Sequence, residues 1–114
     1  MSFLADSNIS VVNNVFIKQM VFPYAGYTAV THAHVYDHQT LLAAGSLLMT
    51  VDGIATIYQA PAVLVIKAGT HHGMTAMVDN TIAYCIHAIT NGECIDEADA
   101  LVQGIGNQAL TNLA

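Results

Sequence analysis

The chain has 114 residues, enough for one domain around one hydrophobic core. It carries two lysines and no arginine against eight Asp and Glu residues, for a net charge of −6. Nucleic-acid binding and a polybasic membrane patch both need clustered Lys and Arg, so this balance argues against either partner. Hydrophobic residues make up 54% and charged residues 9% of the chain, which leaves little polar cover, and we expect a homodimer. Two cysteines are too few for a disulfide scaffold and favour a reducing cytoplasm.

Short β-rich runs, separated by turn residues, follow one another along the chain. Asp52-Gly53 predicts a two-residue hairpin, because both residues suit the positive φ angles of the favoured turn. The stretch 41–66 has one formal charge, but its turn residues cut it into pieces too short for a membrane-spanning helix. Many short strands predict an all-β sandwich or barrel. The expected strands are residues 11–22, 28–34, 40–44, 47–51, 54–59, 62–66, 72–78 and 82–89.

The last part of the chain has a different composition. Residues 93–114 are rich in Ala and Leu and contain two glycines. They predict either a short helical segment or a frayed tail. We therefore expect a single domain over residues 1–114, with a barrel at about 11–89 and a tail at 93–114.

Histidines are the most informative residues of the sequence. His32, His34 and His38 fall within seven positions, and His71-His72 follow a turn further on. His32 and His34 are two apart on an expected strand and so share a face, which His38 can rejoin from the neighbouring strand after a turn at 35–37. Neutral imidazole is the commonest side-chain ligand for Fe, Ni, Cu and Zn. The cluster predicts one divalent transition metal (Fe, Mn, Ni, Cu or Zn, which the sequence does not distinguish) inside a barrel.

At this spacing the chain resembles a small single-domain cupin. The first cupin motif is matched by Gly26, five residues, His32-Ala33-His34, three residues, His38, six residues and Gly45. The second is matched more weakly by Pro61, five residues, and 67–72, which ends in His71-His72. The resemblance covers about residues 11–89 and implies a cupin double-stranded β-helix, a jelly-roll barrel. It also implies metal ligands at His32, His34, His38 and His72.

The chain departs from the cupin pattern at several positions. His38 stands where relatives have Glu or Gln, which gives a four-histidine variant of the site. Gln39 is a rival ligand, since the family tolerates either spacing, but only His38 keeps six residues before Gly45. In the second motif Pro61, Lys67 and Ala76 replace Gly, Pro and Asn, which are mainly turn and support residues.

Other residues complete the expected site. Asp37 can accept the second N–H of a ligating imidazole or act as a solvated turn residue, and His71 is a rim residue. His87, on the last strand, is a candidate general acid/base or an ordinary hydrogen-bonded strand histidine. The residues expected to support the metal ligands are Asp37, Gln39 and His71, the catalytic candidates are His87 and Tyr36, and the pocket residues are Leu42, Met74 and Ala76.

The resemblance implies metal-dependent chemistry on a small organic molecule, either dioxygenase-like or of a lyase or isomerase type. The alternative is a non-catalytic module that binds a metal or a small ligand. Since the chain has no arginine to clamp a phosphate, sugar-phosphate isomerase and nucleotide-sugar epimerase activities, both known among cupins, are less expected.

Overall fold

The structure, a computed structural model, describes residues 3–32 and 37–89, with the backbone alone at residues 30–32. Within these ranges the chain forms nine strands, in agreement with the predicted all-β class. No helix in the described ranges is long and apolar enough to cross a membrane. The strands are β1 (Asp6–Val12), β2 (Val15–Phe22), β3 (Thr28–His32), β4 (His38–Ala44), β5 (Ser46–Val51), β6 (Ile54–Gln59), β7 (Ala62–Ile66), β8 (His72–Ala76) and β9 (Thr81–Ala88).

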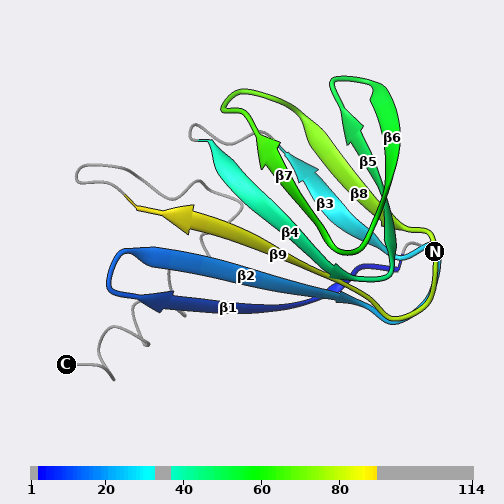
Figure 1. Cartoon of the computed structure of the whole chain (residues 1–114), viewed down its shortest axis with the longest axis horizontal. Coiled ribbons are helices and arrows are strands. Elements are labelled where there is room, and N and C mark those ends of the chain that lie inside the picture. The colour runs from blue at the N-terminus through cyan, green and yellow to red at the C-terminus, as the bar shows by residue number, and fades with distance from the viewer. Residues whose placement is uncertain (1–2, 33–36, 90–114) are drawn as a thin grey trace.

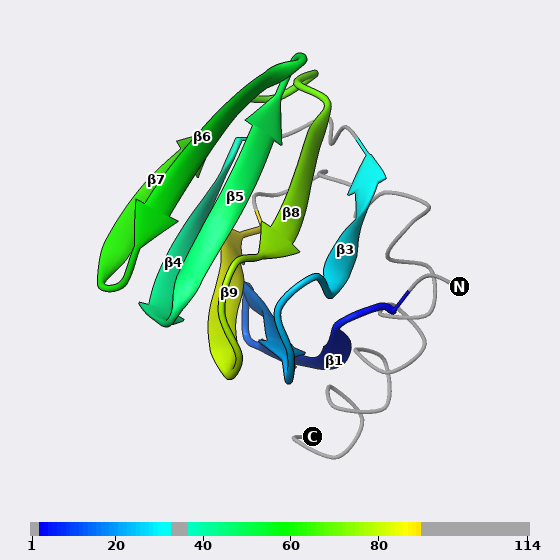
Figure 2. The ribbon, with the colours of Figure 1, turned by 90° about the vertical axis from the view of Figure 1, so that its right-hand side faces the viewer.

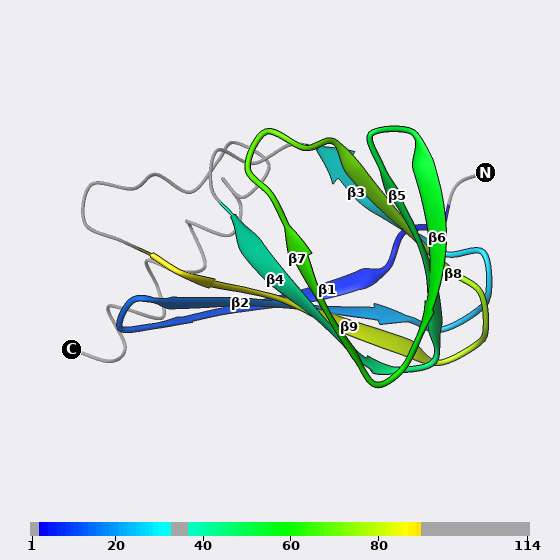
Figure 3. The ribbon, with the colours of Figure 1, turned by 45° about the horizontal axis from the view of Figure 1, so that its top comes forward.

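The strands form two antiparallel sheets (Figures 1 and 2). The first has the order β1-β2-β9-β4-β7 and the second the order β3-β8-β5-β6. Figure 3 shows that the β1–β2 hairpin and the end of β9 reach beyond the four-stranded sheet. The inner faces of the two sheets enclose the interior that holds the candidate site.

The predicted strand at 11–22 is wrong in its extent, because the structure has two strands there. β1 and β2 meet in a tight hairpin at Asn13-Asn14, with Val12 paired to Val15. Asn13 has a φ of 54°, a conformation that asparagine tolerates better than most residues. The hairpin predicted at Asp52-Gly53 is confirmed, with φ angles of 47° and 82° between the strands β5 and β6.

The predicted position of His38 on a strand beside that of His32 also needs correction. β3, which ends at His32, lies in the four-stranded sheet, whereas β4, which begins at His38, lies between β9 and β7 in the other sheet. The two histidine-bearing segments therefore approach the interior from opposite sheets. Sequence parity says which face of a strand a residue occupies, but it does not say which sheet the strand joins.

Apolar side chains from both sheets fill one part of the interior. Phe22, Leu42 and Leu47 are fully buried, and Met49 and Ala83 pack with them. Of the expected pocket residues, Leu42, Met74 and Ala76 all belong to this core cluster.

Candidate metal centre

Two histidines from opposite sheets face each other in the interior. His38 is the first residue of β4 and His72 is the first residue of β8, and they are 5% and 4% exposed. Their ring centroids lie 5.3 Å apart with the ring planes tilted by 52°. The Nδ1 atom of His72 is 3.4 Å from the carbonyl oxygen of Thr70, so one tautomer donates Nδ1–H to this carbonyl and keeps the Nε2 lone pair.

The spacing of this pair can be compared with that of two imidazoles on one ion. A transition metal lies about 2.1 Å from an imidazole nitrogen, and the ring centroid lies about 1.2 Å further along the same line. Two such ligands at a tetrahedral angle therefore have centroids about 5.4 Å apart. The 5.3 Å separation of His38 and His72 fits two adjacent positions around one metal ion.

Of the other two predicted ligands, the structure describes only the backbone of His32 and does not describe His34. The backbone of His32 is paired in register with His72 across the β3–β8 ladder. His34 lies outside the described residues, as do Tyr36 and the predicted tail at 93–114. Over the ranges that the structure covers, no cluster of three or more His, Cys, Asp or Glu side chains assembles. The four-histidine set thus stays a prediction, of which the buried pair is the described part.

The alternation along β4 separates His38 from its rival. His38 and Thr40 are buried, whereas Gln39 between them is exposed on the outer face of the sheet. The two side chains thus lie on opposite faces of β4, and only His38 faces the interior, while its role as a metal ligand stays a prediction.

Further polar side chains lie on the same inner face near the histidine pair. The Oγ1 atom of Thr40 is 3.7 Å from the Sγ atom of Cys85, its register partner on β9. His87, two residues further along β9, is half-buried, and it lines an open depression of about 430 Å³ at the sheet end together with His38 and the exposed Gln39 and Val65. His87 and His38 line the same depression, and the catalytic role of His87 stays a prediction.

The structure shows hydrogen bonds of two expected supporting residues with neighbouring loops. Oδ1 of Asp37 accepts the Ala68 N–H at 2.7 Å, and its Oδ2 lies 4.0 Å from the exposed Lys67 ammonium. The backbone N–H of His71 donates to Oδ1 of Asp52 at 3.2 Å, and the Asp52 N–H donates back to the His71 carbonyl at 2.9 Å. Both contacts fix the loop that leads into β8 and hence into His72.

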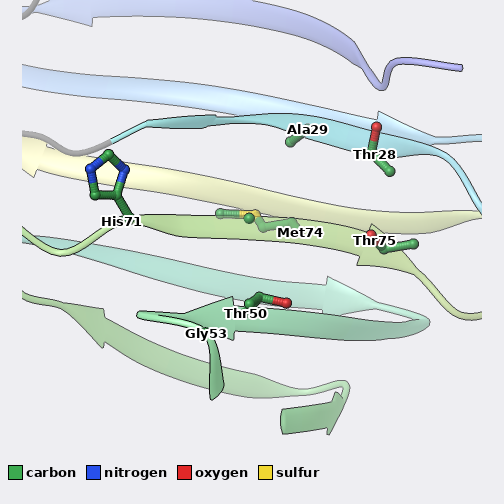
Figure 4. Close-up of a pocket in the computed structure, with 8 residues that line it drawn as sticks. Thr28, Ala29, Thr50, Gly53, His71, Met74 and Thr75 are labelled. Atoms are coloured by element: carbon green, nitrogen blue, oxygen red, sulfur yellow. The ribbon is translucent and has the colours of Figure 1, made fainter. Parts of the chain in front are cut away.

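A second hollow lies on the outer side of the four-stranded sheet (Figure 4). Its volume is about 550 Å³, and His71 lies at one end of it. Gly73 and Thr75 line it and alternate along β8 with the buried His72, Met74 and Ala76. Because most of its lining belongs to the outer face, this groove is separate from the buried histidine pair.

The comparisons with known proteins bear on the fold. No protein-family model and no curated protein matches the chain. Among solved structures, a cupin superfamily protein from Desulfitobacterium hafniense has a TM-score of 0.66 at 18% identity, covering 79% of this chain and 82% of its own. An RmlC-like cupin from Desulfovibrio desulfuricans has a TM-score of 0.65 at 22% identity, covering 75% and 84%. KdgF from Halomonas sp. has a TM-score of 0.66 at 14% identity, covering 77% and 81%.

These similarities define the class of protein by its fold. The chain has the all-β cupin architecture, the double-stranded β-helix or jelly roll, as its resemblance to the cupin motif implied. At these identities the shared property is the fold, and any activity has to be argued from the site.

The sequence analysis assigned no position to Lys18, which by strand alternation lies on the inward side of β2. Lys18 is paired with Cys85 and follows the parity of the buried Phe16 and Met20. In the sequence, Lys18 shares the even positions of 16–22 with Phe16, Met20 and Phe22, which indicates one common face. Apolar residues also occupy odd positions of β2, so the alternation between an inner and an outer face was not clear.

Proposed function

We propose that this chain holds one divalent transition metal inside its barrel through His32, His34, His38 and His72. The observation that carries the proposal is the buried, facing pair of His38 and His72, with a centroid separation suited to one ion. The backbone register of His32 with His72 supports the inclusion of β3. Imidazole is a borderline ligand that suits Fe, Ni, Cu and Zn, whereas Mg and Ca prefer oxygen donors.

We further propose that the centre serves a metal-dependent enzyme acting on a small organic molecule, of a dioxygenase-like or a lyase or isomerase type. A bound ion would supply Lewis acidity and, for a redox-active metal, oxygen chemistry. Four neutral imidazoles leave the +2 charge of the ion uncompensated, so the site would favour anionic ligands. The chain itself contributes the ligands, the apolar floor of Leu42 and Met74, and the inner-face groups Thr40 and Cys85.

A non-catalytic binding module is the alternative function. The burial of both His38 and His72 favours it, because a metal closed off from substrate has a structural or storage role. The two functions differ in whether an exchangeable ligand reaches the ion. Water-proton relaxation of the protein loaded with Mn²⁺ separates them, since an exchangeable water on the metal enhances relaxation and a closed site does not.

Metal analysis of the protein purified without added metal tests the centre itself. We expect about one equivalent in the wild type and a near-complete loss in His38→Ala and His72→Ala. Gln39→Ala is the matched control, because its side chain is exposed on the other face of the same strand, and its metal content should not change. Full occupancy in His38→Ala together with loss in Gln39→Ala would contradict the assigned register and give a site of three histidines and an amide.

The homodimer and the cytoplasmic location expected from composition are also proposals. The low charged fraction of 9% supports self-association. Light scattering at micromolar concentration tests it, and a monomeric mass would overturn it.

A further inference from the structure

The outer face of the five-stranded sheet, turned away from the four-stranded sheet, is apolar over most of its area (Figure 2). An antiparallel sheet with a solvated outer face normally carries polar side chains there. Here most outward positions hold large apolar residues that are half-buried or exposed. They are Ile17 and Val21 on β2, Ile82, Tyr84 and Ile86 on β9, Leu41 on β4, and Val63 and Val65 on β7, and we call this set the outer patch.

The strand register makes the outer patch continuous. Leu41 pairs with Tyr84 on one side and with Val63 on the other. Ile86 pairs with Ile17 on β2 in the same way. The centre of the patch therefore lies on β4 and β9, and Val63, which is 63% exposed on the edge strand β7, lies at its rim. A contiguous apolar face of this kind marks an interaction surface.

The polar side chains on the same face bond to one another. The Asn8 amide donates to the Gln19 carbonyl oxygen at 3.1 Å, and the Gln19 amide donates to the Tyr84 hydroxyl at 2.9 Å. These bonds form a row across β1, β2 and β9. Because a buried polar group is costly only when it lacks a partner, this row lowers the cost of taking the face out of water.

The charge distribution favours another copy of the chain as the partner. Of the outward positions on the five strands, only Asp6 carries a charge, and it lies at the start of the outermost strand β1. A charged partner would find nothing to pair with on the patch. Two copies of a protein with a net charge of −6 repel each other unless they meet through a surface free of acidic groups, and the outer patch is such a surface.

The size of the face is sufficient for a dimer. Neighbouring strands lie about 4.8 Å apart, and residues rise about 3.4 Å along each strand. Five strands of five to eight residues therefore present a flat area of about 24 Å by 22 Å, or about 500 Å². Two copies together bury about 1,000 Å², the size from which a specific interface is stable, and the side chains add to this flat value.

We propose that a second copy of this chain docks on the outer patch, sheet against sheet, around a two-fold axis. The inference rests on the self-association proposed above from composition, for which it names the surface. In a two-fold dimer the patch meets itself, so apolar side chains face apolar side chains. Leu41, Tyr84 and Ile86 form the centre of the contact, and the rim residues exclude water but contribute little to affinity.

The first test compares dimer dissociation constants by sedimentation equilibrium. Leu41→Lys places an ammonium at the centre of the patch, twice in a two-fold dimer, and we expect association to weaken by about a hundredfold or more. Circular dichroism checks its fold, which we expect to be kept, since a lysine stem lies along a sheet while its ammonium stays in water. Ile57→Lys is the matched control, because it adds the same charge to a 55% exposed residue of β6 in the other sheet. Its dissociation constant should equal that of the wild type.

The second test uses the wild type alone, by NMR of methyl groups with a soluble paramagnetic agent. As the protein concentration rises through the dissociation constant, the methyl groups of Leu41 and Ile86 should become shielded from the agent. Those of Ile54 and Ile57, which are 72% and 55% exposed on β6, should stay accessible. Shielding of Ile54 and Ile57 in place of Leu41 and Ile86 would put the dimer contact on the other sheet and overturn the inference.

The remaining outcomes separate this inference from the proposals on which it rests. A dimer whose dissociation constant is unchanged in Leu41→Lys rejects the outer patch and keeps the self-association. A wild type that is monomeric at every concentration rejects both. A monomer in which Leu41 and Ile86 are always shielded shows that another part of the same chain covers the face, which also overturns the inference. Metal content is a separate readout and should be the same in Leu41→Lys as in the wild type, because Leu41 faces away from the histidine pair.

Discussion

The two ends of the barrel interior differ in polarity, and three strands show the change within a few residues. On β4 the inward positions are His38, Thr40 and then Leu42. On β8 they are His72, Met74 and Ala76, and on β9 they are His87, Cys85 and Ala83. We call the first end, with His38, His72, His87, Thr40 and Cys85, the histidine end. We call the other, with Leu42, Ala76, Ala83, Phe22 and Leu47, the packed end.

The difference separates the part of the molecule that stabilises the fold from the part that can bind a ligand. Buried apolar side chains contribute about 25 cal/mol for each Å² removed from water, whereas buried polar groups contribute little and are costly when unsatisfied. A polar cluster in the interior of a 114-residue domain therefore indicates function more than stability. The predictions below test this division, beginning with the largest expected effect.

Leu42→Ala should destabilise the protein the most. Leu42 is fully buried at the packed end, and its truncation leaves a cavity that costs about 2–5 kcal/mol of unfolding free energy. Val63→Ala is the control, because Val63 is 63% exposed and should change stability by less than about 0.5 kcal/mol. Urea unfolding measures both. A Leu42→Ala effect as small as that of Val63→Ala would show that the packed end does not carry the stability.

Gly45→Ala should follow, through the turn that joins the two sheets between β4 and β5. Gly45 has a φ of +85°, and an added Cβ would lie 2.8 Å from the Cα of Thr81 on β9. Thr81 is itself fixed, since its hydroxyl donates to the Val78 carbonyl at 2.9 Å. We expect a loss of about 2–4 kcal/mol from the clash and the strained backbone.

Gly53→Ala is the matched control for Gly45→Ala. Gly53 has a φ of +82° but no heavy atom within 4 Å of an added Cβ, so only the backbone strain of about 1 kcal/mol applies. Thermal unfolding of the two variants separates the two contributions. Equal losses of stability in the two variants would mean that Thr81 moves away from the added methyl group at little cost.

The sequence predicted the fold well because strand alternation and turn residues are local. Asp52-Gly53 gives a hairpin of the expected type, and His38 and Gln39 lie on opposite faces of β4, as strand alternation requires. The partition of strands between sheets is not local, so the placement of His38 opposite the β3 strand was missed. The Asn13-Asn14 hairpin was hidden within a continuous β-rich run.

The candidate site was predicted less completely than the fold. The pairing of His38 with His72 depends on the approach of two strands from different sheets, which residue spacing alone does not give. Asp37 was expected to support an imidazole or to be solvated, and its hydrogen bond to the Ala68 N–H gives it a third role, as a link between loops.

Asp37→Ala should have the smallest effect and tests how far the histidine end depends on the loops around it. The carboxylate accepts the Ala68 N–H at 2.7 Å, and this bond joins the start of β4 to the loop before β8. Because Asp37 is exposed, we expect its loss to cost about 0.5–1.5 kcal/mol of unfolding free energy. Lys67→Met removes only the exposed ion pair at 4.0 Å and should cost less than about 0.5 kcal/mol.

Metal affinity gives the second readout for Asp37→Ala, by competition with a chelator. A carboxylate that supports a ligating imidazole directly would change the affinity by about 10- to 100-fold when removed. Asp37 bonds a backbone N–H of the loop, so we expect a change of less than about tenfold, caused by a looser approach of His72. A hundredfold loss of metal affinity without loss of stability would instead show that the Asp37 carboxylate supports a ligating imidazole directly. The histidine end would then extend beyond the buried pair to the exposed rim.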